Sequence, residues 1–518
     1  MLHWADEVAE ELIAKHPDLE VFTCASGISP SGVVHMGNFR EVATTFFVAK
    51  ALRDRGKSVR FIYSWDEYDR LRKVPAGVDE SFIKYIGQPY AFVPDPFGCH
   101  SSYAEHFELP FVSAMQELGI EVEFLHQAKL YTAGTYVDGV LTALRNRHKI
   151  YDIQYSFKTQ EANAEEREAY YPIQIYCDKC GKDTTTIVGD SDDCAVLEYE
   201  CKCGHHGTVD VRKDFHYKLP WKVDWPMRWK HEGVIFEPGG RDHSSEGGSY
   251  QVSSVIAREI YGIEPPSYRM YDFVRLKGQT TKISSSKGTD MSPEVLLQIY
   301  PPEIVLWLYT RFLPEKAFDL ALDADVLKAY HEFDRMYQKY KDGSADEIES
   351  RIMELSLAGR PADFVPVSAS LIASFAPIVN FDLDMLVDLM NKCGEKVTRD
   401  MVEDRFNRIK YWMENYCPEQ IVKLLPVPNN EFYATLTKEE TGWISTLVEK
   451  MKASKMSPEE MQALLYEIPK IDGEENKARQ KRFFEIVYSL LLGKTKGPRL
   501  YLFLSAVDQN KLINLLDF

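Results

Sequence analysis

Long hydrophobic runs are absent from this chain of 518 residues. No stretch approaches the roughly 18 uncharged apolar residues that a membrane helix needs, so we expect no membrane partner. The first residues, MLHWADEVAEELIAKHP, are acidic and amphipathic. This pattern predicts an N-terminal helix and not a signal peptide.

Cysteine is scarce as well, with nine residues, and an odd number does not suit a disulfide framework. Half of these cysteines are clustered in the sequence, which is typical of a reduced protein with metal sites. We therefore expect a cytoplasmic protein.

Basic residues are outnumbered, because 61 Lys and Arg stand against 79 Asp and Glu and give a net charge of -18. This balance argues only weakly against a nucleic-acid partner. Phosphate contacts depend on where the basic side chains lie and not on their sum. The net charge therefore excludes neither RNA nor a small-molecule substrate.

Internal repeats and low-complexity segments are also missing, and the length predicts roughly three or four domains. VFTCASGISPSG predicts a strand that ends in a Gly-, Ser- and Pro-containing turn. VVHMGNFREVATTFFVAKALRDRGK then predicts a helix, and SVRFIYSWDEYDRL and GIEVEFLHQAKLY predict further strands. Strand, helix and strand in this order form a βαβ unit, so the predicted class is α/β with a Rossmann-type parallel sheet.

The sequence pattern changes between about 160 and 215, where a polar, cysteine-rich segment with short β-like alternation indicates an inserted module. Strand-like segments resume at GVIFEPGGRDH and SYRMYDFVRL, which predicts that the main sheet closes after this insertion. Beyond about 290 the pattern is helical for the rest of the chain. SPEVLLQIY and SPEEMQALLYEI both begin with helix-capping signals.

A first candidate motif lies where the first strand gives way to the helix, in the string PSGVVHMGN. A helix N-terminus presents free N–H groups and a positive dipole end, which suit a phosphate. Gly37 would let an adenine ring approach the backbone. His35 and Asn38, three residues apart, share one helix face and can both donate to triphosphate oxygens. A buried histidine beside a glycine-rich turn is the alternative explanation.

A second candidate motif is RLKGQTTKISSSKG, in which three serines lie between lysines and glycines flank the whole. Such a loop can close on a polyphosphate and stabilise the charge that develops on leaving pyrophosphate. The residues of interest are Lys282, Ser284, Ser285, Ser286 and Lys287. A lone lysine–serine loop is more often a solvated turn. A similar string at Lys455–Ser457 precedes Pro-Glu-Glu and is predicted to cap a late helix instead.

Together the two motifs resemble the HIGH and KMSKS signatures of class I aminoacyl-tRNA synthetases, here as His-Met-Gly-Asn and Lys-Ile-Ser-Ser-Ser. The resemblance extends over nearly the whole chain. SGISPSGVVHMGNFREV, FIYSWDEYDRLRKVP, GGRDHSSEGGS, KISSSKG and the C-terminal GKTKGPRLYLFLSAV look like successive blocks of the class I lysyl-tRNA synthetase family. The usual second lysine of the last signature is Ser285 here, with Lys287 two places on, and Ile283 replaces the usual methionine.

This resemblance implies that L-lysine attacks the α-phosphorus of ATP, and that the lysyl group then passes from the adenylate to tRNA(Lys). Positioning and electrostatic stabilisation suffice for such chemistry. The resemblance implies Lys282 as the main transition-state cation, His35 and Asn38 on the phosphates, Lys287 assisting, and Mg2+ with the ATP. A monomer is favoured over an oligomer.

Lysine needs acceptors for its ammonium groups and aromatic walls for its stem. Gly27 and Ser29 lie at the end of the first strand, where the substrate should sit, although the family often has threonine at the latter position. Glu41, one turn after the first motif, is a further acidic candidate. The residues that match family blocks lining the amino-acid pocket are Trp221, Asp242, His243 and Tyr268.

Cys177-x2-Cys180 and Cys201-x-Cys203 are the paired thiols of the insertion. A small polar module gains stability from tetrahedral Zn2+. The second pair is one residue short of the usual spacing, so Cys194, His205 or His206 could replace a ligand. Reduced thiols packed in a small domain are the alternative.

Asp95, Cys99, His100 and His106 have the right ligand types for a second Zn2+, and the resemblance supports a site here. A polar loop near the substrate cleft is the alternative. Both ions would be structural, since the chemistry does not require them.

The expected domains are 1–159 and 216–290 for the two catalytic halves, 160–215 for the insertion, 291–345 for a stem-contact segment, and 346–518 for a helical anticodon-binding domain. In the last, Lys477–Phe484 together with Lys494, Lys496 and Arg499 combines basic charge with aromatic rings, which suits RNA. Ordinary solvated helix faces look much the same.

Three other functions compete with this interpretation. The same fold could serve glutamate or cysteine. A nucleotidylyltransferase would share both motifs without touching tRNA, although it has little use for a long helical domain. A non-catalytic RNA-binding paralogue is disfavoured by the intact His35, Asn38 and Lys282.

Overall fold

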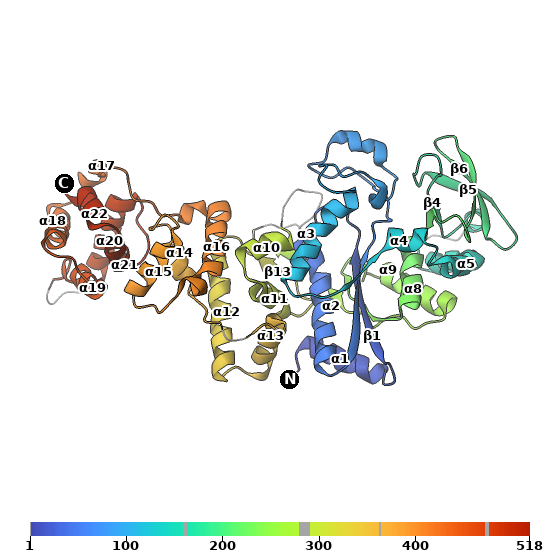
Figure 1. Ribbon diagram of the computed structural model, residues 1–518, viewed down its shortest axis with the longest axis horizontal. Coiled ribbons are helices and arrows are strands. Elements are labelled where there is room, and N and C mark those ends of the chain that lie inside the picture. Colours follow the sequence, from blue (N-terminus) through green and yellow to red (C-terminus); the bar gives the residue numbers. More distant parts are fainter. Residues whose placement is uncertain (1, 159–162, 279–290, 362–363, 472–475) are drawn as a thin grey trace. The chain divides into compact units, whose positions relative to one another are not determined.

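The computed structural model (Figure 1) describes residues 2–158, 163–278, 291–361, 364–471 and 476–518. The chain divides into two compact units. Unit 1 comprises Met1–Leu297, Pro302–Leu320 and Lys339–Arg360, and unit 2 comprises Gln298–Pro301, Ala321–Gln338 and Pro361–Phe518. No helix among the described residues is long and apolar enough to span a bilayer.

Unit 1 is built on a four-stranded parallel sheet with the order β3-β2-β1-β9. Its strands are β1 (Val21–Ile28), β2 (Ser58–Trp65), β3 (Glu123–His126) and β9 (Val234–Phe236). Residues 22–26 of β1 are all buried, as expected of a central strand covered on both faces. The carboxyl ends of β1, β2 and β3 are in register, so the residues that follow them meet at one edge. The parallel sheet and its first βαβ unit are as the sequence predicts.

Helix α2 (Met36–Asp54) connects β1 to β2 and contributes much of the core. Helix α1 (Trp4–Lys15), predicted from the N-terminal sequence, packs against α2. Asp6, 4% exposed, fixes this layer, because its carboxylate accepts hydrogen bonds from Arg55 and Arg351. Burial alone would raise the pKa of Asp6, but the two guanidinium groups hold it below its usual value.

Helix α3 (Tyr103–Glu117) leads into β3, and four short helices then follow, of which the last lies at the start of the insertion. They are α4 (Gln127–Thr132), α5 (Val137–Arg145), α6 (Arg147–Ser156) and α7 (Ala164–Glu168). The sequence HQAKLY, expected to continue a strand, instead turns helical at Gln127, because the carboxylate of Glu67 accepts the N–H groups of Gln127 and Ala128.

The insertion consists of two small antiparallel sheets, β4-β8 and β5-β6-β7. Their strands are β4 (Gln174–Ile175), β5 (Thr185–Asp190), β6 (Val196–Cys201), β7 (His206–Asp210) and β8 (Tyr217–Lys218). Leu197 and Val209 are fully buried in a cluster that also includes Val140 of α5 and Val252 of α9 (Ser249–Ile256). The module therefore shares its core with the neighbouring helices.

After the insertion, α8 (Trp221–Glu232) returns the chain to the main sheet, where β9 joins β1. The segment SYRMYDFVRL was expected to close this sheet, and it does so only at its first residue, Ser267, which forms an isolated parallel bridge with Phe236 of β9. Its strands β11 (Met270–Tyr271) and β12 (Val274–Leu276) form separate parallel pairs with β10 (Gly239–Gly240) and β13 (Phe318–Leu320). β13 is also an exception to the helical pattern predicted beyond 290.

The remaining elements are otherwise helical. Those up to residue 360 are α10 (Pro293–Ile299), α11 (Pro302–Thr310), α12 (Asp325–Asp342) and α13 (Glu347–Leu357). Those of the rest of unit 2 are α14 (Ala369–Phe375), α15 (Leu383–Lys392), α16 (Arg399–Tyr416), α17 (Asn430–Tyr433), α18 (Lys438–Ala453), α19 (Pro458–Glu467), α20 (Lys477–Leu492), α21 (Leu500–Ala506) and α22 (Gln509–Leu516). Ser457 caps α19 in a capping box with Glu460, which confirms the prediction for that string.

Candidate active site

A cavity of about 450 Å³ opens at the carboxyl ends of β1 and β2. Seven of the residues predicted from the sequence line it: Gly27, Ser29, Asn38, Glu41, Trp221, Asp242 and His243. These residues are spread over 217 positions of the chain (from 27 to 243), and the fold brings them together around one cavity. Ligand sites outside the carboxyl ends of parallel strands are the general rule for open α/β sheets.

The first motif forms the N-terminus of α2, with His35 as its N-cap. Nδ1 of His35 accepts the N–H groups of Gly37 at 3.0 Å and Asn38 at 3.4 Å, while Oδ1 of Asn38 accepts the N–H of His35 at 3.3 Å. A neutral His35 ring therefore carries its proton on Nε2, and the donor end of the Asn38 amide is its Nδ2. The cap fixes both donors at a helix N-terminus, where an anion is favoured.

Gly37 has a packing role that the sequence did not reveal. A Cβ at this position would lie 2.9 Å from Cε1 and 3.0 Å from Nδ1 of His35. Any side chain would push the imidazole out of the cap, so glycine keeps the histidine in place.

Glu41 lies one turn further along α2 and faces the end of β1. Its Oε1 accepts the N–H of Gly27 at 3.0 Å, and its Oε2 accepts the Tyr271 hydroxyl at 2.7 Å. Burial raises the pKa of Glu41 to about 8, although both hydrogen bonds favour the carboxylate. A cationic ligand group beside Glu41 would restore its ionised form.

Ser29 lines the cavity and is hydrogen-bonded to a network of buried charged side chains. Its hydroxyl donates to Oδ2 of Asp69 at 2.7 Å, and the other Asp69 oxygen accepts from the ammonium of Lys218. Lys218 is 3% exposed and also faces Asp224, which is fully buried, at 3.8 Å. The network continues through Arg228, the partner of Asp224 at 3.4 Å.

Arg228 closes this network at the cavity wall, donating to Asp66 at 2.6 Å and to Ser64 at 2.9 Å. Three carboxylates (Asp66, Asp69, Asp224) thus share two cations within a mostly buried region. The excess of negative charge favours a positively charged substrate.

Aromatic rings form another wall, in which Trp221 stacks on Trp225 with a centroid distance of 4.8 Å. The His243 ring lies 6.3 Å from Trp221 and 5.8 Å from Trp225. Because Trp221 is only half-buried and the guanidinium of Arg228 lies 5.0 Å from its ring, this tryptophan belongs to the cavity and not to the core. Asp242 is exposed in the turn that follows β10.

Tyr268, also predicted for the pocket, is not among the described side chains that line the cavity. It stacks on Tyr250 at 3.8 Å, and its hydroxyl lies 2.7 Å from that of Ser244. A Cβ at Gly239 would collide with the Tyr268 hydroxyl, so Tyr268 packs behind the pocket strand.

The second motif lies outside the described residues, so the structure does not place Lys282, Ser284, Ser285, Ser286 or Lys287. The chain enters this stretch from β12.

Several acidic and basic groups of the cavity were missed by the sequence analysis: Asp66, Asp69, Arg72, Arg228, Glu237 and Tyr271. The first two had a signal, because SWDEYDR places carboxylates directly after β2. Glu237 accepts the indole N–H of Trp229 at 2.7 Å, and burial raises its pKa to about 7. Glu237 directly follows β9, but it reaches the cavity only because β9 pairs with β1, and the sequence does not encode that pairing.

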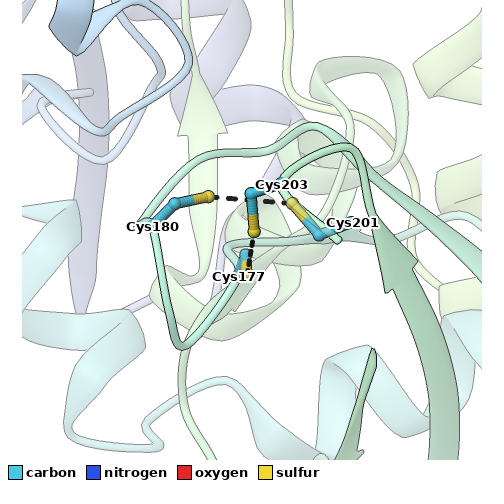
Figure 2. A group of neighbouring side chains, drawn as sticks. All are labelled: Cys177, Cys180, Cys201 and Cys203. Atoms are coloured by element: carbon cyan, nitrogen blue, oxygen red, sulfur yellow. Dashed lines mark hydrogen bonds between the residues drawn. The ribbon is translucent and has the colours of Figure 1, made fainter. Parts of the chain in front are cut away.

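Four thiols converge in the insertion, as Figure 2 shows. The Sγ atoms of Cys177 and Cys203 are 3.8 Å apart, and those of Cys180 and Cys201 are 3.7 Å apart. Tetrahedral zinc with Zn–S bonds of about 2.3 Å separates two sulfurs by about 3.8 Å. These four cysteines fit a zinc ion, and Cys194, half-buried with φ 55°, is not one of the group.

A second group brings together Asp95, Cys99, His100 and His106. Cys99 Sγ lies 3.1 Å from Nδ1 of His100 and 3.3 Å from Nδ1 of His106, which in turn lies 3.3 Å from Oδ1 of Asp95. Burial would raise the pKa of Asp95, but backbone N–H donors hold it at about 2, so the carboxylate is ready to bind a cation. The donor set fits zinc.

The basic stretch of α20 is only partly available to RNA. Phe483 is fully buried in the helical core. Arg482 pairs with Glu440 at 2.7 Å, and Arg479 pairs with Glu439. Besides Arg482, the exposed cations are Lys477, Lys481, Lys494, Lys496 and Arg499. Of the two aromatic rings in this stretch, Phe483 faces the core and is not available to RNA, whereas Phe484 is half-buried.

Known proteins resemble this chain over its whole length. The family model of class I (K) tRNA synthetases matches residues 2–359. The lysine–tRNA ligase of Pyrococcus horikoshii is 36% identical over 529 residues, covering 100% of this chain and 99% of the relative. That of Treponema pallidum is 35% identical and covers 100% and 98%. That of Streptomyces coelicolor is 34% identical and covers 99% and 97%.

A match over residues 2–359 spans more than half of the chain, and the identities above 30% extend to both ends. The chain belongs to the class I (K) family of tRNA synthetases.

Proposed function

We propose that this protein ligates L-lysine to tRNA(Lys) with ATP, through a lysyl-adenylate, and releases AMP and pyrophosphate. The full-length similarity to lysine–tRNA ligases carries this proposal. The cavity supports it, because six acidic side chains against two arginines line it: Glu41, Asp66, Asp69, Glu232, Glu237 and Asp242, against Arg72 and Arg228. Such a wall suits the ammonium groups of lysine.

The residues at the N-terminus of α2 would hold the phosphates. ATP enters as its Mg2+ complex, and its triphosphate meets the Nε2 side of His35 and the amide of Asn38. The carboxylate of bound lysine attacks the α-phosphorus, and the bond to pyrophosphate breaks. Lys282, assisted by Lys287 and the serines between them, would stabilise the charge on the leaving group.

The remaining side chains of the cavity would select lysine. Ser29, oriented by Asp69, and Glu41, held by Gly27, would bind the α-amino group of lysine in a pocket built on β1. Trp221 and His243 would cover the aliphatic stem, and Asp242 would accept an ammonium group, while Tyr268 would support the pocket strand from behind.

Zinc would be structural at both clusters. The four cysteines would tie the ends of the β5–β6 hairpin to the preceding loop, and Asp95, Cys99, His100 and His106 would hold their own loop to α3. All nine cysteines are free thiols, which suits a reducing, cytoplasmic setting. We further propose that the protein acts as a monomer.

The helical segment 346–518 would bind the anticodon arm of tRNA, and residues 291–345 its acceptor stem. The exposed cations Lys477, Lys481, Lys494 and Lys496 support the first role.

Lysine-dependent ATP–pyrophosphate exchange tests the proposal, with and without tRNA(Lys) and with other amino acids alongside. We expect exchange with lysine only, a loss of at least 100-fold in Lys282→Ala, and no change in Lys455→Ala. The control removes an exposed lysine from a similar Lys-Met-Ser string. Exchange with glutamate or cysteine instead would overturn the lysine assignment.

A further inference from the structure

Three side chains that the proposed reaction does not use converge beside the main sheet. Glu67 follows β2, His126 ends β3, and Glu108 comes from α3. One ligand atom of each lies within 4.8 Å of the others. Nδ1 of His126 is 3.5 Å from Oε1 of Glu67 and 3.8 Å from Oε2 of Glu108.

An ion pair with His126 does not provide every carboxylate oxygen of this cluster with a hydrogen-bond donor. Glu67, 3% exposed, already accepts two backbone N–H groups at 3.1 Å each. Glu108 is 6% exposed, and its Oε1 has no hydrogen-bond partner among the described residues. The 3.8 Å to His126 is too long for a hydrogen bond. A buried carboxylate oxygen without a donor is costly, so it calls for a positive partner.

We propose that Glu67, Glu108 and His126 bind a divalent cation of the Mn2+ or Zn2+ type. With metal–ligand bonds of about 2.1 Å, tetrahedral ligands lie about 3.4 Å apart, close to the observed 3.5 and 3.8 Å. Two carboxylates balance the charge of the ion, and one neutral imidazole completes a set of three. The His126 side chain is 31% exposed, which leaves a side open to water.

This site is distinct from the cluster around Asp95. His106 and Glu108 are two residues apart in α3, and their side chains therefore point about 200° apart around the helix. An ion held by Glu108 would join α3 to the ends of β2 and β3.

The position of the ion gives it a consequence for the cavity. Asp66 and Gln127, the neighbours of Glu67 and His126 in the chain, both line the cavity wall. Gln127 donates to Ser64 at 2.7 Å, and Asp66 accepts from Arg228. The ion would hold this wall in place without touching substrate, as a positioning element.

Full-length protein that holds only two zinc equivalents, one for each of the two zinc clusters proposed above, is titrated with Mn2+, and the electron paramagnetic resonance signal of free Mn2+ tests the site without ATP. We expect one bound equivalent in the wild type, and affinity at least 10-fold weaker in Glu108→Gln and His126→Gln. Glu117→Gln, which removes an exposed carboxylate from the same helix, should bind as the wild type does. Mn2+ should also raise the unfolding temperature of the wild type more than that of Glu108→Gln.

Equal Mn2+ binding by wild type and Glu108→Gln would overturn the proposal and leave an ion pair only. Glutamine preserves the shape of the side chain, so near-wild-type circular dichroism of Glu108→Gln shows that lost binding is not lost folding. The zinc content and the lysine-dependent exchange are measured on the same samples. Exchange that fails while Mn2+ still binds would count against the proposed function and not against this site.

Discussion

Replacing Lys218 by methionine tests the buried charge network that supports the cavity. Methionine has nearly the same length but no charge. In the wild type, Lys218 lies between Asp69 and Asp224 and is 3% exposed. Its removal leaves Arg228 as the one remaining cation of this network for three carboxylates in the described structure.

The expected cost follows from the burial of these groups. Breaking a buried ion pair by removing one partner costs about 3–5 kcal/mol, because the other charge stays buried. Asp69 borders the cavity with 25% of its side chain exposed, so water relieves part of this penalty and about 3 kcal/mol is expected. For a unit of this size, each kcal/mol of lost stability lowers the unfolding temperature by roughly 2 °C, so the Lys218→Met variant should unfold about 6 °C below the wild type.

The deficit should shrink in acid. Burial alone would raise the pKa of Asp69, but the ammonium of Lys218 holds it below its ordinary value. In the wild type this carboxylate therefore contributes stability above its unfolded pKa, which is lost as the pH falls through the lower folded pKa. Without Lys218 the pKa of Asp69 rises, so the variant regains stability relative to the wild type as the pH falls toward about 4.

Scanning calorimetry of the full chain at several pH values measures these effects. Lys230→Met, at an exposed position of α8, is the control and should shift the transition by less than about 0.5 kcal/mol. The double variant Lys218→Met/Asp69→Asn should recover part of the loss, because it removes the unpaired charge. A single variant that costs less than about 1 kcal/mol, or a double variant that is no more stable, would refute the network argument.

Three further predictions concern the pocket and the thiols. Because burial raises the pKa of Glu41 to about 8, the folded protein holds a proton that the unfolded chain releases, so the free energy of unfolding of the wild type should fall as the pH rises from 5 to 8. In calorimetry, Glu41→Gln should show a flatter dependence on pH. Equal slopes for the two proteins would contradict the raised pKa of Glu41. Gly27→Ala should lower the free energy of unfolding by about 1–3 kcal/mol, because its Cβ would lie 2.7 Å from a backbone oxygen of β2. The control Gly442→Ala, in the open surroundings of α18, should be neutral or slightly stabilising. Equal effects of the two variants in urea unfolding would show that β1 and β2 move apart without cost, and would contradict the prediction. In metal analysis, Cys180→Ser should lose one zinc equivalent and Cys194→Ser should lose none. The reverse result would show that Cys194, and not Cys180, is the zinc ligand.

Local sequence determined much of this protein. The apolar strand of residues 21–28, the glycine-bearing turn and the following helix each carry their own signal, so the βαβ unit and a helix N-terminus at the first motif were predictable, although the role of His35 as N-cap was not. The spacing of Cys177, Cys180, Cys201 and Cys203 likewise predicted a cluster of thiols, and the structure contains this cluster. Such signals work because neighbouring residues in the chain are also neighbours in space.

Only the tertiary structure decided the rest. Asp66, Arg228 and Glu237 meet at the cavity because the insertion returns the chain to β9, beside β1, and no local pattern encodes that pairing. The same holds for Phe483, whose ring faces a core built from distant helices and not RNA. Long-range pairing places groups from far along the chain into one buried space, where burial and charge, rather than sequence spacing, fix what each group does.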